Sequence, residues 1–235
     1  MRKVENYCTI DVIRGKCKNM IPRVAFEYLE SGTEKELLLG SNKSQFDSIQ
    51  FIPKFCLGEK NTSLKTTFLN EDFSSPIGVA PVGLTGLIWP NAEKFLLKIA
   101  DKNEIPFCLS TVATCSLEEI DPKDEFSSKS KWFQLYPPKD LDILDSLLDR
   151  AKKSGFSNLV VTVDIPAPSR RERSKHAGLN MPLKFTPKLI LDGLMHLKWT
   201  FATITNGLPR LKTVESYSNN NSLKFVSRFV GNRLG

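Results

Sequence analysis

The stretch WFQLYPPKDLDILDSLLDRAKKSGFSNLVVTVDIP, residues 132–166, decides the fold. It places a helical pattern over 141–154 between two short apolar runs, 132–135 and 159–163. A helical crossover returns the chain to the end of the sheet at which the first strand began, so the two strands run parallel. Upstream, the runs 77–80 and 106–109 flank a helical pattern over 92–102, and a shorter helical pattern follows over 116–120. The sequence therefore predicts four parallel strands joined by helices.

Polar or small residues follow each of these four runs directly. They are Pro81, Val82 and Gly83 after the first run, Ser110 and Thr111 after the second, Tyr136 after the third and Asp164 after the fourth. Parallel strands align their C-terminal ends on one face, and that face carries the chemistry of a β/α barrel. The predicted fold class is α/β: the N-terminal half of a (β/α)8 TIM barrel, with a helical N-terminal extension and a long insertion after strand 4.

The length of the chain supports half a barrel. A complete barrel takes about 250 residues, and only about 160 of the 235 residues follow the start of the first run. We expect an N-terminal helical segment with barrel-bottom strands over 1–75 and the first four β/α units over 76–165. Residues 166–235 are expected to form an insertion that faces the active site or a membrane, followed by a truncated C-terminus.

Composition argues against several other classes of protein. The net charge is +7, but the basic residues are scattered and no nucleic-acid-binding signature accompanies them. The five cysteines are odd in number and form no C-x-x-C pair, so neither a disulfide framework nor a zinc site is indicated. We expect no metal, no nucleic-acid partner and a reducing, cytoplasmic compartment. No apolar run of about 18 residues predicts a membrane-spanning helix.

Polar side chains near the strand ends are the candidates for chemistry. Gln134 and Tyr136 are two residues apart and therefore share one face of a strand, where an amide can bind a ring imide and a phenol can stabilise a developing alkoxide. Thr162 and Asp164 repeat this spacing on the next strand. A carboxylate there can orient a base or bind a cation. The alternative is that Asp164 caps the following turn.

An arginine cluster, RRER over 170–173, follows the fourth strand. Guanidinium groups suit two-pronged binding of carboxylate or phosphate, and a solvated surface run is the alternative. The two histidines, His176 and His196, lie in the insertion, where surface or structural roles are expected.

Taken together, these segments resemble the flavin mononucleotide (FMN)-dependent α-hydroxy-acid oxidoreductases, the family of glycolate oxidase, lactate dehydrogenase and mandelate dehydrogenase. The matching pieces are EYLESG (27–32), IGVAPVGLTGL (77–87), LSTVATCSLEEI (109–120), WFQLY (132–136), TVDIP (162–166) and RRER (170–173). The insertion over 184–211 is most similar to that of the membrane-associated bacterial L-lactate and mandelate dehydrogenases.

The resemblance implies a role for each matching residue. Two groups would bind the FMN cofactor: the backbone of Pro81, Val82 and Gly83, and the side chains of Ser110, Gln134 and Thr162. Tyr28 and Arg171 would bind the substrate carboxylate and Tyr136 the substrate hydroxyl, while Asp164 would hold the imidazole of the family's catalytic histidine. That histidine, a flavin-contacting lysine and a second substrate arginine have no counterpart in this sequence. Ser169 stands where the family usually has glycine.

The resemblance implies oxidation of an L-2-hydroxy acid, such as lactate, to the 2-oxo acid. We expect this chain to be a partial and inactive form of such an enzyme. A non-catalytic half-barrel that assembles with a complementary chain is the alternative, and a homo-oligomer is a further hypothesis, because an exposed strand edge demands a cover. The mixture of apolar and basic residues in the insertion suits peripheral contact with the inner face of the cytoplasmic membrane, and a mobile lid is the soluble alternative.

Overall fold

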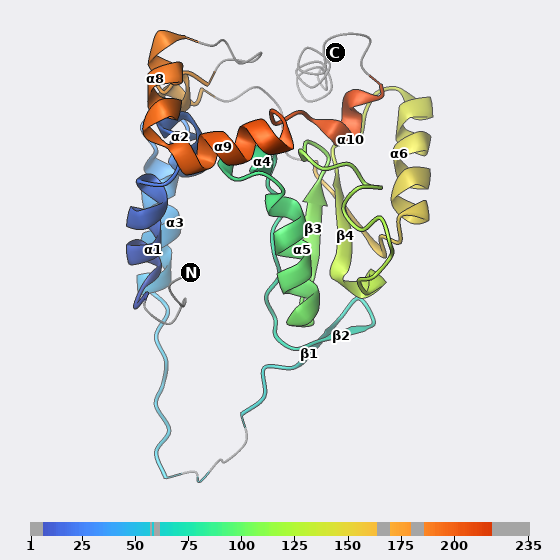
Figure 1. Cartoon of the computed structure of the whole chain (residues 1–235). Helices are drawn as coiled ribbons and strands as arrows, with labels where there is room; N and C mark the ends of the chain where they lie inside the picture. The colour runs from blue at the N-terminus through green and yellow to red at the C-terminus, as the bar shows by residue number, and fades with distance from the viewer. Residues whose placement is uncertain (1–6, 57, 59–61, 164–169, 180–185, 218–235) are drawn as a thin grey trace.

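A parallel three-stranded sheet with flanking helices carries the main core (Figure 1). The structure is a computed structural model, and it describes residues 7–56, 58, 62–163, 170–179 and 186–217. Strands β3 (Phe107–Ser110), β4 (Lys131–Leu135) and β5 (Asn158–Val161) lie in that order, all parallel. Helix α5 (Ala92–Lys102) precedes β3 and α6 (Leu141–Lys153) connects β4 to β5, as the sequence pattern predicted.

The alternation of side chains divides the strands between two faces. Leu109 and Phe133 point outward and are buried with Leu97 of α5 and Leu147 of α6 in one core. Their neighbours along each strand point to the opposite, inner face. This division places Gln134 on the inner face, at the C-terminal end of β4.

Helix α6 begins and ends at recognisable signals. The Asp140 side chain accepts hydrogen bonds from the N–H groups of Asp142 and Ile143, which an N-cap residue is suited to do. The helix ends at Lys153 with Ser154 as its C-cap, and Gly155 follows with a φ of +76°, a conformation that favours glycine. The cap and the stop explain why α6 matches the helix predicted over 141–154.

The first predicted strand, 77–80, is reduced to one bridge. Val79 pairs with Phe107 in parallel, and its N–H donates to the carbonyl of Pro106 at 2.8 Å. Pro76, Pro81 and Pro106 have no N–H to donate, so the ladder cannot extend along this segment. The apolar run is therefore extended chain beside β3 rather than a regular strand.

A turn replaces the short helix that was predicted over 116–120. Leu117 and Ile120 are buried in the core, which accounts for the apolar pattern. The Asp121 carboxylate then accepts the N–H groups of Glu125 and Phe126. Within the turn itself, the Ser116 hydroxyl accepts the N–H of Glu119 at 3.2 Å, a side-chain bond that satisfies a backbone group without a helix.

A hairpin of β1 (Thr66–Phe68) and β2 (Glu71–Phe73) lies at the N-terminal end of β4 (Figure 1). The Phe68 ring stacks on Trp132 at 5.9 Å between centroids, and Phe73 meets the same indole edge-on at 6.1 Å. Trp132 is the second residue of β4, so the hairpin covers the bottom of the sheet. The hairpin falls within 1–75, the segment for which barrel-bottom strands were expected.

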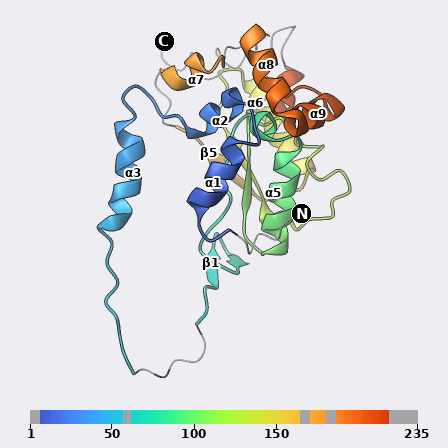
Figure 2. The same ribbon diagram turned by 60° about the vertical axis from the view of Figure 1, so that its left-hand side comes forward.

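The N-terminal region is helical, as expected. Helices α1 (Ile10–Lys18) and α2 (Arg23–Glu30) precede α3 (Leu37–Asp47), and α2 packs against the short α4 (Thr85–Ile88). In α2, Val24, Ala25 and Phe26 are buried, whereas α3 buries none of its residues. Figure 2 shows α3 standing apart from the rest of the molecule.

The insertion forms helices that were not predicted from its proline-rich sequence. After α7 (Glu172–His176) come α8 (Pro187–Met195), α9 (Leu197–Asn206) and α10 (Lys212–Glu215). Outside the insertion, a short 3-10 helix, η2 (Ser128–Ser130), precedes β4. The indole N–H of Trp199 donates to the carbonyls of Leu87 and Ile88 at 3.1 Å. The Thr213 hydroxyl donates to the carbonyl of Cys115. The insertion is thus anchored to the barrel segments at two points.

Candidate active site

A chain of side-chain hydrogen bonds crosses the C-terminal ends of the three strands. Gln134 is buried, and its Oε1 accepts from the Ser110 hydroxyl at 3.1 Å and from the N–H of Thr111 at 3.3 Å. Its Nε2 donates to the hydroxyl of Thr162 at 2.9 Å. The structure therefore brings together the three side chains that the family resemblance assigned to the cofactor ring.

Thr111 fixes the end of β4 from the neighbouring strand. This fully buried residue donates its hydroxyl to the Gln134 carbonyl at 2.5 Å. The hydroxyl oxygen of Thr111 also accepts the N–H of Tyr136 at 3.1 Å. Sequence reasoning considered Thr111 only as a small residue with backbone groups, and its role as a brace for Gln134 and Tyr136 emerges from the structure.

Tyr28 reaches this end of the sheet from α2. Its hydroxyl donates to the carbonyl of Gly83 at 2.8 Å. Burial raises the pKa of the Tyr28 phenol, while the charge of Arg171 offsets part of that rise and the neighbouring Tyr136 adds to it. Tyr28 therefore remains a neutral hydrogen-bonding group at neutral pH.

Arg171 lies beside Tyr28. Its guanidinium carbon is 5.7 Å from the centroid of the Tyr28 ring, and its Nη1 is 3.5 Å from the Tyr28 carbonyl oxygen. The side chain is exposed to solvent, which leaves the planar guanidinium open to an anion. Tyr28, Tyr136 and Arg171 thus form one group at the edge of the candidate site.

The arginine cluster divides into different roles. Arg173 forms ion pairs with Glu27 and, at 2.7 Å, with Glu36, so it ties α7 to the N-terminal helices. The carbonyl of Arg170 accepts the N–H of Glu34. Arg171 is the member of the cluster that reaches the tyrosine.

The segment over 81–83 passes close to the loop that follows β3. A Cβ atom on Gly83 would lie 2.6 Å from Cγ2 of Val112 and 3.4 Å from the hydroxyl of Tyr28. The next N–H, that of Leu84, donates to the carbonyl of Val112 at 3.0 Å. Only glycine permits this approach, and it sets the Gly83 carbonyl within reach of Tyr28.

The structure describes all but one of the predicted site residues. Asp164 lies outside the residues that the structure describes. His176 ends α7, and His196 Nδ1 lies 2.7 Å from the carbonyl oxygen of Asp192. Both histidines lie in helices or helix ends of the insertion.

A buried carboxylate near the site was missed by sequence reasoning. Glu93 Oε1 accepts from the N–H and the hydroxyl of Thr114 at 2.9 and 2.6 Å. The Thr114 hydroxyl in turn accepts the N–H of Gly86 at 2.9 Å. These bonds hold α5, the β3 loop and α4 together. A glutamate in the first turn of a helix is ordinarily exposed, so no sequence signal marks this one.

Comparison with known proteins identifies the family. A model of the family described as FMN-dependent dehydrogenase matches residues 17–234. The L-lactate dehydrogenase of Pseudomonas syringae pv. syringae (strain B728a) is 35% identical over 218 residues, which cover 93% of this chain and 53% of that protein.

Solved structures show the same architecture. The crystal structure of the monotopic membrane protein (S)-mandelate dehydrogenase matches with a TM-score of 0.88 at 28% identity, over 98% of this chain and 61% of that one. A soluble mutant of the membrane-associated (S)-mandelate dehydrogenase from Pseudomonas putida matches with a TM-score of 0.70 at 30% identity, over 79% and 52%.

The chain spans about half the length of the curated relatives it matches. Its parallel strands and crossover helices correspond to part of the TIM barrel of these enzymes, which confirms the predicted fold class. Because the family model matches nearly the whole sequence, this chain belongs to the FMN-dependent dehydrogenase family.

Proposed function

We propose that this chain supplies the flavin-binding and substrate-binding half of an enzyme that oxidises an L-2-hydroxy acid to the 2-oxo acid. The observation that carries the proposal is the placement of two groups at one end of the sheet. One is the hydrogen-bonded set of Ser110, Gln134 and Thr162, and the other is the pair of Tyr28 and Arg171. Neutral polar groups beside a cation suit a flat ring next to a small carboxylate.

The donors and acceptors fit the ring of FMN. Gln134 carries a second amide hydrogen beyond the one it donates to Thr162, and the hydroxyls of Ser110 and Thr162 can both donate and accept. The backbone of Pro81, Val82 and Gly83 would border the ring. The flavin, when bound, supplies the two-electron acceptor of the reaction.

The remaining residues would bind and orient the hydroxy acid. Arg171 would hold the carboxylate through a two-pronged charged hydrogen bond, and Tyr28 would donate to the same group. Tyr136 would donate to the substrate hydroxyl oxygen. Asp164 would orient the family's histidine base, which would accept the proton of the substrate hydroxyl.

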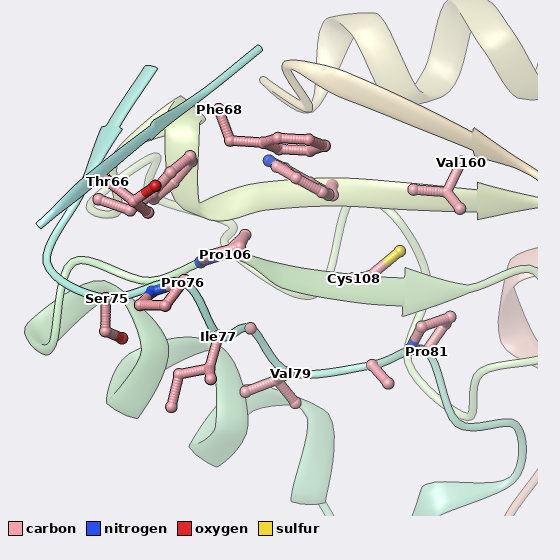
Figure 3. A pocket seen from close by; sticks show the side chains of 14 residues that line it. Thr66, Phe68, Ser75, Pro76, Ile77, Val79, Pro81, Pro106, Cys108 and Val160 are labelled. Atoms are coloured by element: carbon pink, nitrogen blue, oxygen red, sulfur yellow. The ribbon is translucent and has the colours of Figure 1, made fainter. Parts of the chain in front are cut away.

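Completion of the barrel by further β/α units is part of the proposal. A cavity of about 420 Å³ opens on the inner face of the sheet, between the β1–β2 hairpin, residues 75–81 and the strands (Figure 3). Phe68, Cys108 and Val160 line it, and Pro81 lies near the C-terminal end of β3. Since barrel interiors are filled by layers of side chains, we expect inward-facing residues of the missing strands to fill this cavity.

Exposed apolar residues favour an assembling half-barrel as the second candidate function. Leu159 and Val161, on the outer face of β5, are 44% and 47% exposed. Phe51 and Ile52, in the chain that follows α3, are 93% and 89% exposed. Apolar side chains exposed to this degree are candidate contacts for a partner. On this reading the chain acts as a binding partner of the complementary half without catalysing a reaction itself.

Reconstitution tests both candidates. We would co-express the chain with the part of the Pseudomonas syringae L-lactate dehydrogenase that lies beyond the matched region. We would then measure dye reduction with L-lactate and with L-mandelate. The enzyme proposal predicts a soluble yellow complex that oxidises at least one of these acids. A stable complex that carries FMN and oxidises neither would contradict it. A stable complex without FMN would favour the assembly role.

Site variants of the active complex assign the roles. Tyr136→Phe removes the donor to the substrate oxygen and is expected to lower kcat by about 100-fold. Arg171→Met is expected to raise KM by roughly 10- to 100-fold, since it removes the charged bond to the carboxylate. Arg23→Met, at an exposed position of α2, is the matched control and should change neither constant.

We also propose that residues 166–235 form a membrane-facing unit. Exposed apolar side chains gather on α8 and α9, among them Met195, Leu197 and Phe201 at 69%, 68% and 71% exposure. Lys198 is exposed beside them. No helix within the described part of the chain is long and apolar enough to cross a membrane. An apolar surface with adjacent cations suits binding at the interface of an anionic bilayer.

Vesicle flotation tests this location. The double variant Leu197→Ser/Phe201→Ser should lose most of the binding to vesicles that contain phosphatidylserine. The matched control, Leu37→Ser/Leu38→Ser on the exposed α3, should float like the unchanged chain. Equal flotation of both double variants would contradict the assignment of the membrane surface to α8 and α9.

A further inference from the structure

A second cavity, separate from the strand ends, lies between the α8–α9 hairpin and helices α2 and α4. Its volume is about 230 Å³, and Val24, Leu87, Leu194, Trp199 and Ile204 are among the residues that line it. We propose that this cavity binds the ring of a quinone. The acceptor role of such a quinone rests on the proposed function, whereas its binding does not.

An unpartnered hydroxyl lines this cavity. Thr203 is only 3% exposed, and its Oγ1 has no hydrogen-bond partner within the described residues. A buried hydroxyl without a partner is costly, so the site is incomplete without a group that accepts its hydrogen. The other hydroxyl in the lining, that of Thr200, already donates to the carbonyl of Gly193 at 2.6 Å. The cavity therefore offers one donor to a ligand.

The chemistry of the lining selects a neutral, flat ligand. Among the described residues, the side chains that line it are apolar apart from the two threonines, and none of them is charged, so a carboxylate or phosphate head would lose its hydration without compensation. Trp199 forms a fixed wall because its N–H is bound to two carbonyls. The cavity exceeds the roughly 150 Å³ that is enough to bind benzene. A quinone ring supplies a flat apolar face and a carbonyl oxygen for Thr203.

The cavity opens at the exposed apolar surface of α8 and α9 on one side and is lined by α2 on the other. Ile190, Leu194 and Ile204 line it and are more than half exposed on the apolar surface of α8 and α9. A lipid-soluble ligand could therefore enter directly from a membrane. On the inner side, Val24 lies one turn before Tyr28 on α2, about 6 Å along the helix axis.

This position would suit a quinone that accepts the electrons of the reaction. Two electrons and two protons leave the hydroxy acid as it becomes the 2-oxo acid. The same number of electrons and protons reduces the quinone to the quinol, so the overall exchange balances without another reactant.

Tryptophan fluorescence of the chain alone tests the binding. Ubiquinone-1, a short-chain quinone, should quench the emission of Trp199 in a saturable manner. Thr203→Val keeps the shape of the side chain and removes the hydroxyl, so it should weaken binding by about three- to tenfold. Thr205→Val, at an exposed position of the same helix, is the matched control and should bind ubiquinone-1 like the unchanged chain.

The outcomes separate this inference from the proposed function. The assay needs neither FMN nor a hydroxy acid, so saturable binding that depends on Thr203 supports the inference even if the reconstituted complex oxidises no acid. Equal quenching in the two variants would overturn it, as would the absence of saturation. Tighter binding of dodecanol than of ubiquinone-1 would also overturn it, because the cavity would then be an alkyl-chain site.

Discussion

Replacement of Gln134 by leucine is the sharpest test of the hydrogen bonds at the strand ends. Leucine keeps much of the side-chain volume but removes three bonds, those to the Ser110 hydroxyl, the Thr111 N–H and the Thr162 hydroxyl. The Thr111 N–H is fully buried and would be left without an acceptor, at a cost of about 1–3 kcal/mol. The two hydroxyls can rotate, and each would lose about 0.5–1 kcal/mol.

We therefore expect Gln134→Leu to lower the free energy of unfolding by about 3 kcal/mol. With an m-value of about 2–3 kcal/mol/M in urea, the unfolding midpoint should fall by about 1–1.5 M. Circular dichroism during urea titration measures this shift. Gln45→Leu, at an exposed position of α3, is the control and should shift the midpoint little. If both variants unfold at the same urea concentration, Gln134 does not hold the strand ends together.

Two further predictions concern ion pairs below and beside the sheet. The Lys131 ammonium is fully buried and contacts Asp121, which is also buried, and Asp124, which is 81% exposed. Asp121→Asn should therefore destabilise the fold by about 3 kcal/mol and Asp124→Asn by less than about 1 kcal/mol, as measured by urea unfolding; equal effects would contradict the assignment. The Arg150 guanidinium lowers the pKa of Glu118 from 4.5 to about 2. A lowered pKa stabilises the fold above the unfolded-state value and loses that effect as pH falls toward the folded-state value. The stability difference between the unchanged chain and Glu118→Gln should therefore shrink between about pH 5 and pH 2, and a constant difference would contradict this linkage.

The parallel sheet and the side chains on the inner face of its strand ends could be predicted because both follow from short-range patterns. The spacing of apolar runs fixed the order of strands and helices, and strand alternation placed Gln134 on the inner face near Thr162. Register and hydrogen bonds then agree with that placement. The first strand was overestimated because its apolar residues suggested a ladder that the flanking prolines cannot form.

Long-range contacts could not be predicted from the pattern. Tyr28 reaches Gly83 from 55 residues away, and only the family resemblance pointed to it. Thr111 and Glu93 support the site through buried hydrogen bonds, and neither has a sequence signal that separates it from a surface residue. The apolar character of the insertion was visible, but its fold into α8 and α9 depends on the Trp199 contacts with α4.

The affinity of the reconstituted complex for FMN tests the central claim most directly. The claim is that the polar groups at the ends of β3, β4 and β5 bind the flavin ring. Fluorescence titration should give a dissociation constant about tenfold weaker for Thr162→Val than for the unchanged complex, since one hydrogen bond to the ring is lost. Thr205→Val should bind FMN unchanged. Identical dissociation constants for all three proteins would contradict the placement of the flavin at these strand ends.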